Sequence, residues 1–472
     1  MWRLPGIVGC VGLLLASATA RETKNLFVEG YADRLSTVAG ESVSLHVSTS
    51  VPTFDVEIAR EGKDRQVVWT KTAIPGREYP IPADASSRGC QWPEALKVEI
   101  PATWKSGYYT IKFRVKDNGG TYSERNARTA EGTAFFVVRS GRPGKDAKIL
   151  IQLSTNTYNA YNNWGGYSLY AYNGREKVQG RRVSFDRPPA SQFFNWEHPF
   201  VQWAERQGYS LDYAINSDLE FHPEIVKPYP LILSVGHDEY WSAPMRDTLE
   251  AFIAAGGNVA FLSGNSVCWQ VRSEDQGRAL VCWKQAFEFD PVYKTDDHRL
   301  LSTLWSHHLV NRPENRLTGV GFLAGGYHKS HGQYMDAPGS FTVQQPGHWV
   351  FQGTNLQPGD SFGAKHTVVG YECDGCEFTL KEGRPVPTYT DGTPTSFKIL
   401  ATAPAKWHPD DSDWYDRFQK GRLGAAVLGI YTQGGTVLTT GSTDWAHGLR
   451  GGDPVVEQVT KNIIDRLGRP EN

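Results

Sequence analysis

We predict two folded parts in this chain: an all-β sandwich, followed by an α/β domain built on a parallel sheet. Residues 26–140 contain short stretches in which apolar and polar residues alternate between turns, as in half-buried antiparallel strands. Over residues 148–468 apolar strands alternate with amphipathic helices, an order typical of a parallel sheet with helices on both faces. A length of 472 residues also exceeds what one ordinary core fills.

The N-terminus predicts export. Arg3 precedes an apolar run from Ile7 to Ala16, and Ala18-Thr19-Ala20 follows it. A positive start, a short apolar core and small residues at the end form a secretory signal peptide, and the run is too short to cross a bilayer. We therefore assign residues 1–20 to a signal peptide and expect a periplasmic or extracellular protein. Lipidation at Cys10 is the weaker alternative, because the apolar stretch before it is very short.

Charge and composition narrow the range of partners. The 49 lysines and arginines nearly balance the 51 aspartates and glutamates, and the formal net charge is −2. This balance does not favour nucleic acid or an anionic membrane surface as a partner. We expect a small-molecule substrate and no transmembrane segment, with a homo-oligomer as one possible assembly.

Four segments of the first part have the character of strands. Ser42–Val47, Phe54–Ile58 and Tyr108–Val115 alternate apolar and polar residues, whereas Ala134–Val138 is continuously apolar, as in a strand buried on both faces. About seven strands in a segment of this length fit an immunoglobulin-like sandwich. The polar, turn-rich Arg139–Lys145 is the expected linker.

The second part starts with a strand over 149–153, and a helix is expected from Trp196 to Gln207. A strand over 231–235, a helix over 243–255 and a strand over 258–263 follow one another with short connections. Ser242 can cap the middle helix, and two glycines end it. The apolar stripe of that helix consists of Met245, Leu249, Phe252 and Ile253.

The alternation of strands and helices is lost between about residues 290 and 400. This segment is rich in glycine, proline, histidine and aromatic residues, and we interpret it as a β-rich insertion. The alternation returns with strands over 425–430 and 435–439. The chain then closes with a helix whose apolar face carries Val455, Val459, Ile463 and Leu467.

Polar clusters follow several of these strands at their carboxyl ends, where open α/β sheets bind ligands. His237-Asp238-Glu239 follows the strand 231–235, and Asn265 follows the next strand. A loop over 154–170 with four tyrosines follows the first strand. That loop is either a hydrogen-bonded aromatic loop or a metal or substrate site.

Two further groups have a plain structural interpretation beside a functional one. Lys284 is either a cation of the site or a solvated surface lysine. Gly441–His447, at a later strand end, either closes the site or caps the last helix; we favour the cap.

Six cysteines are present, and loss of Cys10 with the signal peptide leaves an odd number. Cys373 and Cys376 are either a tight disulfide or two plain thiols. Cys268 has no nearby histidine in the sequence to activate it and is predicted to be a buried thiol. Ser361 matches the G-x-S-x-G elbow, but no apolar strand precedes it and no helix follows. The pairs His307-His308 and His328-Lys329-Ser330-His331 lack the helical context of a zinc protease and are predicted to lie in loops.

Three motifs taken together resemble a known family. They are Gly-His-Asp-Glu-Tyr-Trp-Ser at 236–242, Asn-Thr-Tyr-Asn-Ala-Tyr-Asn at 156–162 and Phe-Leu-Ser-Gly-Asn at 261–265. Taken together, and in their order along the chain, they resemble the catalytic large subunit of N,N-dimethylformamidase, over roughly 148–467. The resemblance implies a fold similar to class I glutamine amidotransferases, with a flavodoxin-like parallel sheet. It also implies a mononuclear iron held by two tyrosines and a glutamate in place of their Cys–His–Glu triad.

Carried over residue by residue, the resemblance implies that Glu239 binds the iron and that His237 lines the site. Asn265 matches the asparagine of the next strand end, and Lys284 falls close to the site lysine of the family. Glu372, in Gly370-Tyr371-Glu372, matches a glutamate that is catalytic or lies just outside the ligands.

The resemblance also implies the tyrosine ligands. The first is Tyr161, with Tyr158 as the alternate. The second is assigned to Tyr170, since Phe185 cannot serve as a ligand. Phenolate and carboxylate oxygens are hard donors that suit Fe³⁺.

The expected function is therefore hydrolysis of amide or related C–N bonds, with the metal polarising a carbonyl and activating water. Glu372 or His237 would carry the proton to the leaving amine, and Asn265 would hold the oxyanion. The alternative is a non-catalytic exported protein that binds carbohydrate or another ligand, consistent with the 15 tryptophans. A ThuA-like protein with another metal in the same pocket lies between the two. Dimethylformamide itself is not expected as the natural substrate, because the family enzymes act inside cells with a small accessory subunit.

Overall fold

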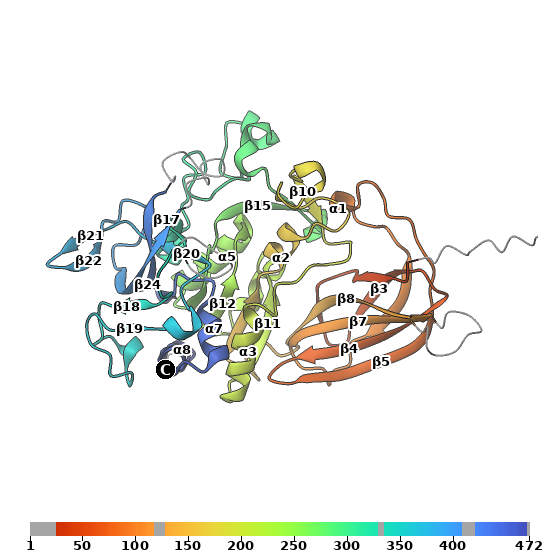
Figure 1. The fold of residues 1–472 in the computed structure, drawn as a ribbon, viewed down its shortest axis with the longest axis horizontal. Coiled ribbons are helices and arrows are strands. Elements are labelled where there is room, and N and C mark those ends of the chain that lie inside the picture. Colours follow the sequence, from red (N-terminus) through yellow and green to blue (C-terminus); the bar gives the residue numbers. More distant parts are fainter. Residues whose placement is uncertain (1–24, 118–127, 329–334, 408–420, 470–472) are drawn as a thin grey trace, which may run out of the picture.

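The computed structural model describes residues 25–117, 128–328, 335–407 and 421–469. The predicted signal peptide lies outside these residues. Two small sheets precede a large mixed sheet with helices against it, and the two arrangements lie side by side (Figure 1). No helix in the described ranges is long and apolar enough to cross a membrane.

The first part consists of two sheets that share one core. One sheet has the order β1-β3-β6 and the other β2-β8-β7-β4-β5. Val43 and Leu45 from the first meet Ile58, Ile111 and Phe136 from the second in this core. The bounds are β1 (Val28–Ala32), β2 (Ser36–Val38), β3 (Ser42–Thr49), β4 (Thr53–Glu61), β5 (Arg65–Pro75), α1 (Ala85–Arg88), β6 (Glu94–Glu99), β7 (Gly107–Asp117) and β8 (Arg128–Arg139).

Strand β8 belongs to two cores at once. Ala134, Phe136 and Val138 face the core of the first part. Phe135 and Val137 face the main core of the second part, because successive side chains of a strand point to opposite faces. The continuously apolar sequence predicted this double burial, and it joins the two parts of the chain.

The main sheet of the second part has the order β11-β9-β12-β14-β25-β24-β23-β17-β20, with β18 and β19 attached to it. The strands from β11 to β25 are parallel. The remaining strands are antiparallel to their neighbours. The bounds are β9 (Ile149–Leu153), β11 (Leu211–Ile215), β12 (Leu231–His237), β14 (Asn258–Gly264), β17 (Gly321–Tyr327), β18 (Phe341–Val343), β19 (Ser361–Phe362), β20 (Glu372–Gly375), β23 (Lys398–Lys406), β24 (Leu423–Gln433) and β25 (Gly435–Thr439).

The predicted parallel sheet is therefore only part of the observed one. A hairpin at Gly434, whose φ of 82° suits glycine, makes β24 and β25 antiparallel. The segment predicted as a β-rich insertion supplies strands that continue the same sheet instead of standing apart from it. The immunoglobulin-like and amidotransferase-like assignments stay predictions.

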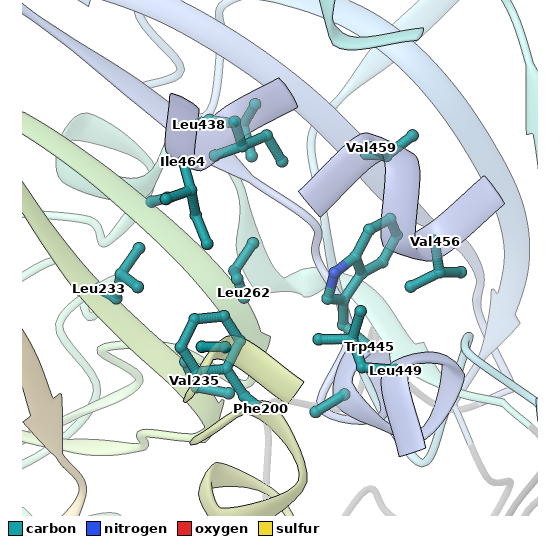
Figure 2. Packing of buried hydrophobic residues seen from close by; sticks show 14 of the residues in the cluster. Phe200, Leu233, Val235, Leu262, Leu438, Trp445, Leu449, Val456, Val459 and Ile464 are labelled. Carbon is teal, nitrogen blue, oxygen red and sulfur yellow. The ribbon is translucent and has the colours of Figure 1, made fainter. Parts of the chain in front are cut away.

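Helices cover both faces of the parallel half of the sheet. Helices α3, α7 and α8 pack on one face and form the main core with β9, β12 and β14 (Figure 2). Helices α4 and α5 pack on the opposite face. Burial of each of these aliphatic or aromatic side chains stabilises the fold by about 1.5–3 kcal/mol. The carboxyl ends of the strands are therefore held in place by a well-packed core. The helices are α2 (Thr155–Tyr161), α3 (Glu197–Arg206), α4 (Asn216–Phe221), α5 (Ala243–Ala254), α6 (Asn315–Thr318), α7 (Trp445–Gly451) and α8 (Pro454–Leu467).

A smaller sheet lies over the carboxyl ends of the parallel strands, with the order β10-β16-β15-β13. Ser242 caps α5 as predicted, because its side chain accepts a hydrogen bond from the backbone of Met245. The remaining elements are β10 (Arg182–Ser184), β13 (Tyr240–Ser242), β15 (Trp269–Glu274), β16 (Ala279–Val281), β21 (Phe378–Lys381), β22 (Arg384–Pro387) and the short 3₁₀ helix η5 (Lys284–Phe289).

Candidate metal centre and active site

The backbone brings three predicted site residues to one edge of the sheet. Strands β12 and β14 pair in parallel, with His237 opposite Gly264, so Glu239 and Asn265 begin neighbouring loops. Strand β20 passes close to this edge. A side chain at Gly264 would come within 2.4 Å of the backbone oxygen of Glu372, so the glycine allows Glu372 to approach His237.

Three side-chain oxygen groups meet at this edge. The Tyr161 hydroxyl donates to Oε2 of Glu239 at 3.0 Å. The Tyr170 hydroxyl lies 2.9 Å from both carboxylate oxygens of Glu239. Tyr161 ends helix α2, where a loop was expected, and Thr157 of the same helix accepts a hydrogen bond from the Glu239 backbone. The structure thus brings together the three residues that the sequence predicts as metal ligands.

The alternate ligand Tyr158 lies elsewhere. Its hydroxyl donates to Glu197, not to Glu239. Burial raises the pKa of both Tyr161 and Tyr170 well above 10, and the charge of Glu239 raises it further. Without a cation the two phenols therefore keep their protons and donate to the carboxylate.

His237 lies between two carboxylates. Its Nε2 is 2.8 Å from Oε2 of Glu372 and 3.3 Å from Oε2 of Glu239. Burial by itself lowers the pKa of His237, but the two carboxylates outweigh burial and raise this pKa to about 10. Burial raises the pKa of Glu239, but the contacts with His237 outweigh it and lower the value. The pair His237–Glu372 can therefore hold and transfer a proton beside the oxygen cluster.

Lys284 is fully buried, so its interpretation as a surface lysine is wrong. Its Nζ lies 3.3 Å from the ring centroid of Tyr170. Burial lowers the pKa of Lys284 to about 8, against the attraction of Glu239. This ammonium group stabilises the negative charge of Glu239 and is attracted to the face of the Tyr170 ring.

Asn265 contacts the second carboxylate of the site. Its side-chain Nδ2 donates to Oε2 of Glu372 at 3.2 Å, so this amide orients the carboxylate. The φ of Asn265 is 48°, in the left-handed region that asparagine tolerates.

The cap favoured for Gly441–His447 is wrong: Asp444 precedes α7 without a capping hydrogen bond to its side chain, and Asp453 caps the last helix, α8. Asp238 accepts hydrogen bonds from Ser234 and Asn216 behind the strand. Asp444, in the late strand-end cluster, accepts from the indole of Trp196, which packs against His237. The contacts of Asp238 and Asp444 hold the backbone and the aromatic neighbour of His237 in place. Neither carboxylate belongs to the oxygen cluster.

Of the two alternatives for Cys373 and Cys376, the structure has the plain thiols. Cys373 belongs to the core under α7 and α8, and Cys376 to the core on the opposite face of the sheet. The two side chains therefore point away from each other. Cys268 is a buried free thiol, as expected, and burial raises its pKa well above 9.

Sequence analysis missed Arg187, which clamps the segment between the two tyrosines. The guanidinium is fully buried. It donates to the backbone oxygens of Trp164 and Tyr167 and to the side chain of Asn159. Two more donors reach the backbone oxygens of Asn162 and Ser184. Arginine alone has a fork of five donors that can do this, but nothing in the local sequence identifies these acceptors.

We expect Arg187→Lys to loosen the tyrosine segment. Lysine has three donors and no planar fork, so several buried carbonyls lose their partners, and the free energy of unfolding should fall by about 3 kcal/mol. Chemical denaturation measures this loss. Arg175→Lys is the control, because Arg175 is an exposed arginine just beyond this segment and lies over the ring of Tyr167. Equal stability of the two variants would contradict the clamp.

Known proteins similar to this chain belong to the family that the three motifs resemble. The family model of the N,N-dimethylformamidase beta subunit-like C-terminal region matches residues 55–461. The chain belongs to this family. Beta subunits of N,N-dimethylformamidase from Alcaligenes sp and Paracoccus aminophilus are each 23% identical to it, over 445 and 447 residues. These matches cover 81% of the chain and 55% of each relative, so the chain spans about half of their length. The relatives are named beta subunits, whereas the sequence analysis expected likeness to a large subunit.

Solved structures add no assignment of the fold. A ThuA-like protein from Parabacteroides merdae covers 70% of the chain and 92% of its own, with 13% identity and a TM-score of 0.27. A β-D-glucuronidase from Dictyoglomus thermophilum covers 50% of the chain and 43% of its own, with 10% identity and a TM-score of 0.14. Similarity at this level does not establish a shared fold.

Tyr161, Tyr170 and Glu239 fit a ferric ion by the chemistry of their side chains. Two phenols and one carboxylate offer hard oxygen donors. Both hydroxyl oxygens lie 2.9–3.0 Å from the Glu239 carboxylate, so the three side chains converge at one place. Within the described residues, no group of three or more histidine, cysteine, aspartate and glutamate side chains is arranged to hold a metal.

Proposed function

We propose that this protein hydrolyses amide or related C–N bonds with a mononuclear ferric ion held by Tyr161, Tyr170 and Glu239. One observation carries the proposal: the two buried tyrosine hydroxyls converge on the Glu239 carboxylate, next to a His237–Glu372 pair. Membership of the dimethylformamidase family supports a hydrolase. When bound, the ion supplies Lewis-acid chemistry, in which a carbonyl is polarised and a water acidified.

The side chains around the centre would divide the work of proton transfer. Hydrolysis adds the elements of water across the C–N bond, so the carbonyl carbon gains an oxygen and the amine leaves with a proton. Glu372 can accept the proton of the attacking water, because Asn265 holds its carboxylate in place. His237, 2.8 Å from that carboxylate, can pass a proton to the leaving nitrogen.

The substrate and the location of the protein belong to the same proposal. The relatives are named for dimethylformamide, and we propose a small amide as substrate without assigning its substituents. Arg3 and the apolar run from Ile7 to Ala16 support export. A homo-oligomer is compatible with relatives that are named as subunits.

Metal analysis and a visible spectrum of the purified protein test the proposal. We expect about one iron per chain and a tyrosinate-to-iron absorption band, since phenolate ligands give ferric iron a visible colour. Amine release from a panel of small amides, dimethylformamide included, should stop after chelation and return with added iron. Colourless protein that gains neither iron nor the band on reconstitution would contradict the proposal. Saturable glycan binding by such metal-free protein would instead favour a carbohydrate-binding role.

A further inference from the structure

Two buried hydrogen-bond donors stand outside the oxygen cluster, one behind each of two predicted ligands. The Tyr240 hydroxyl donates to the hydroxyl oxygen of Tyr170 at 2.7 Å. The indole Nε1 of Trp269 donates to Oε1 of Glu239 at 2.8 Å. Strands β13 and β15 pair in parallel with Tyr240 opposite Trp269, so one ladder of the small sheet presents both donors.

The direction of the tyrosine hydrogen bond follows from the acceptors. An ionised carboxylate can only accept, so the Tyr170 proton points to Glu239. The Tyr170 oxygen is then left to accept the proton of Tyr240. If a metal ion displaces the proton of Tyr170 and the proton leaves to solvent, Tyr240 still donates, now to a phenolate, and such charge-assisted bonds are stronger.

The surroundings of Tyr170 agree with a stabilised anion. Tyr240 is fully buried, and a buried hydroxyl without an acceptor costs about 1–3 kcal/mol. The ammonium group of Lys284 lies over the Tyr170 ring, 3.3 Å from its centroid. Negative charge on Tyr170 would therefore meet a donor at its oxygen and a cation over its ring.

We propose that Tyr240 is a positioning residue that donates to the phenolate of Tyr170 and sets how strongly this ligand binds the ferric ion. Trp269 does the same for the carboxylate of Glu239. The inference rests on the proposed function, since it concerns the ligands of that ion. It assigns to Tyr240, next to the glutamate in the sequence, a role that the motif alone does not reveal.

Removal of the donor should have two measurable effects. We expect Tyr240→Phe to lower the affinity for iron by about 10- to 100-fold, the usual effect of losing a hydrogen bond to a metal ligand. The tyrosinate band should move to longer wavelength, because a phenolate without its donor gives up an electron more easily. Iron titration monitored at this band, with circular dichroism as a check on folding, measures both effects.

Three further variants separate hydrogen bonding from packing. Tyr240→3-fluorotyrosine keeps the ring and makes a more acidic donor, so the band should move to shorter wavelength. Trp269→Phe removes the donor to the carboxylate and should weaken iron binding without the shift to longer wavelength. Tyr172→Phe is the control and should change neither property, because the side chain of Tyr172 is 64% exposed and contacts Tyr170 through its ring, with centroids 5.4 Å apart.

The outcomes distinguish this inference from the proposed function. A band in the wild type that stays in place and at equal affinity in Tyr240→Phe would overturn the inference alone. Shifts of the same sign in Tyr240→Phe and in the fluorotyrosine variant would overturn it as well, since packing and not donation would then be responsible. A wild-type protein without iron or band would overturn the proposed function and the inference together.

Discussion

Glu239→Gln should remove iron from the protein and abolish amide hydrolysis. The amide of glutamine is isosteric but carries no charge, and one of its two oxygen positions becomes an NH₂ donor. Glu239 is also the buried anion shared by His237 and Lys284. Loss of one partner from a buried charge cluster costs about 3–5 kcal/mol, so the melting temperature should fall together with the iron content. Metal analysis, the visible spectrum and thermal unfolding measure these effects.

The neighbouring acid provides a matched control for this substitution. Asp238 is fully buried, like Glu239, but bonds to Ser234 and Asn216 behind the strand. Asp238→Asn should therefore keep the iron and the visible band. Full iron content in Glu239→Gln, or equal loss of iron in both variants, would contradict the assignment of Glu239 as a ligand.

Glu372→Gln should separate catalysis from metal binding. Glu372 contacts His237 and Asn265, and the tyrosine hydroxyls reach Glu239 instead. The variant should keep iron and its band, while kcat for amide hydrolysis should fall by about 10²- to 10⁴-fold, the range of general acid–base catalysis. Steady-state kinetics of amine release, on samples of equal iron content, measures the change.

Glu377→Gln is the corresponding control in the same segment. Glu377 lies on the surface in an ion pair with Arg422. It has no part in the proposed proton transfer, so kcat should not change. If Glu372→Gln lost iron in parallel with activity, Glu372 would belong to the metal site itself. Unchanged kcat in Glu372→Gln would remove it from the mechanism.

Much of the parallel half of the sheet was predictable from local sequence. The strand over 149–153 and the helix that Ser242 caps were predicted to within a residue or two of the observed β9 and α5. Both signals act over short distances, because continuous apolar runs mark buried strands and a serine before an apolar stripe marks a helix start. The antiparallel pairing of the other half was not predicted, since the pairs between β17, β20 and β23 join residues far apart in the chain.

The site was predictable where it lies at strand ends. His237, Glu239 and Asn265 follow β12 and β14 directly, and the carboxyl ends of neighbouring parallel strands meet at one edge. Tyr161 and Tyr170 came from the order of motifs within a family. The structure adds that both hydroxyls reach Glu239 and that Tyr158 does not.

Sequence by itself determined which residues end the strands, which helix faces are apolar, and which residue types are available for hard metal ligands. Each of these depends on neighbours within a few positions. Tertiary structure alone decided that Lys284 is buried over the Tyr170 ring, that Tyr240 donates to that tyrosine, and that Arg187 holds the segment between the ligands. These contacts join separate elements, and their strength comes from burial and hydrogen-bond direction, which exist only once the chain has folded.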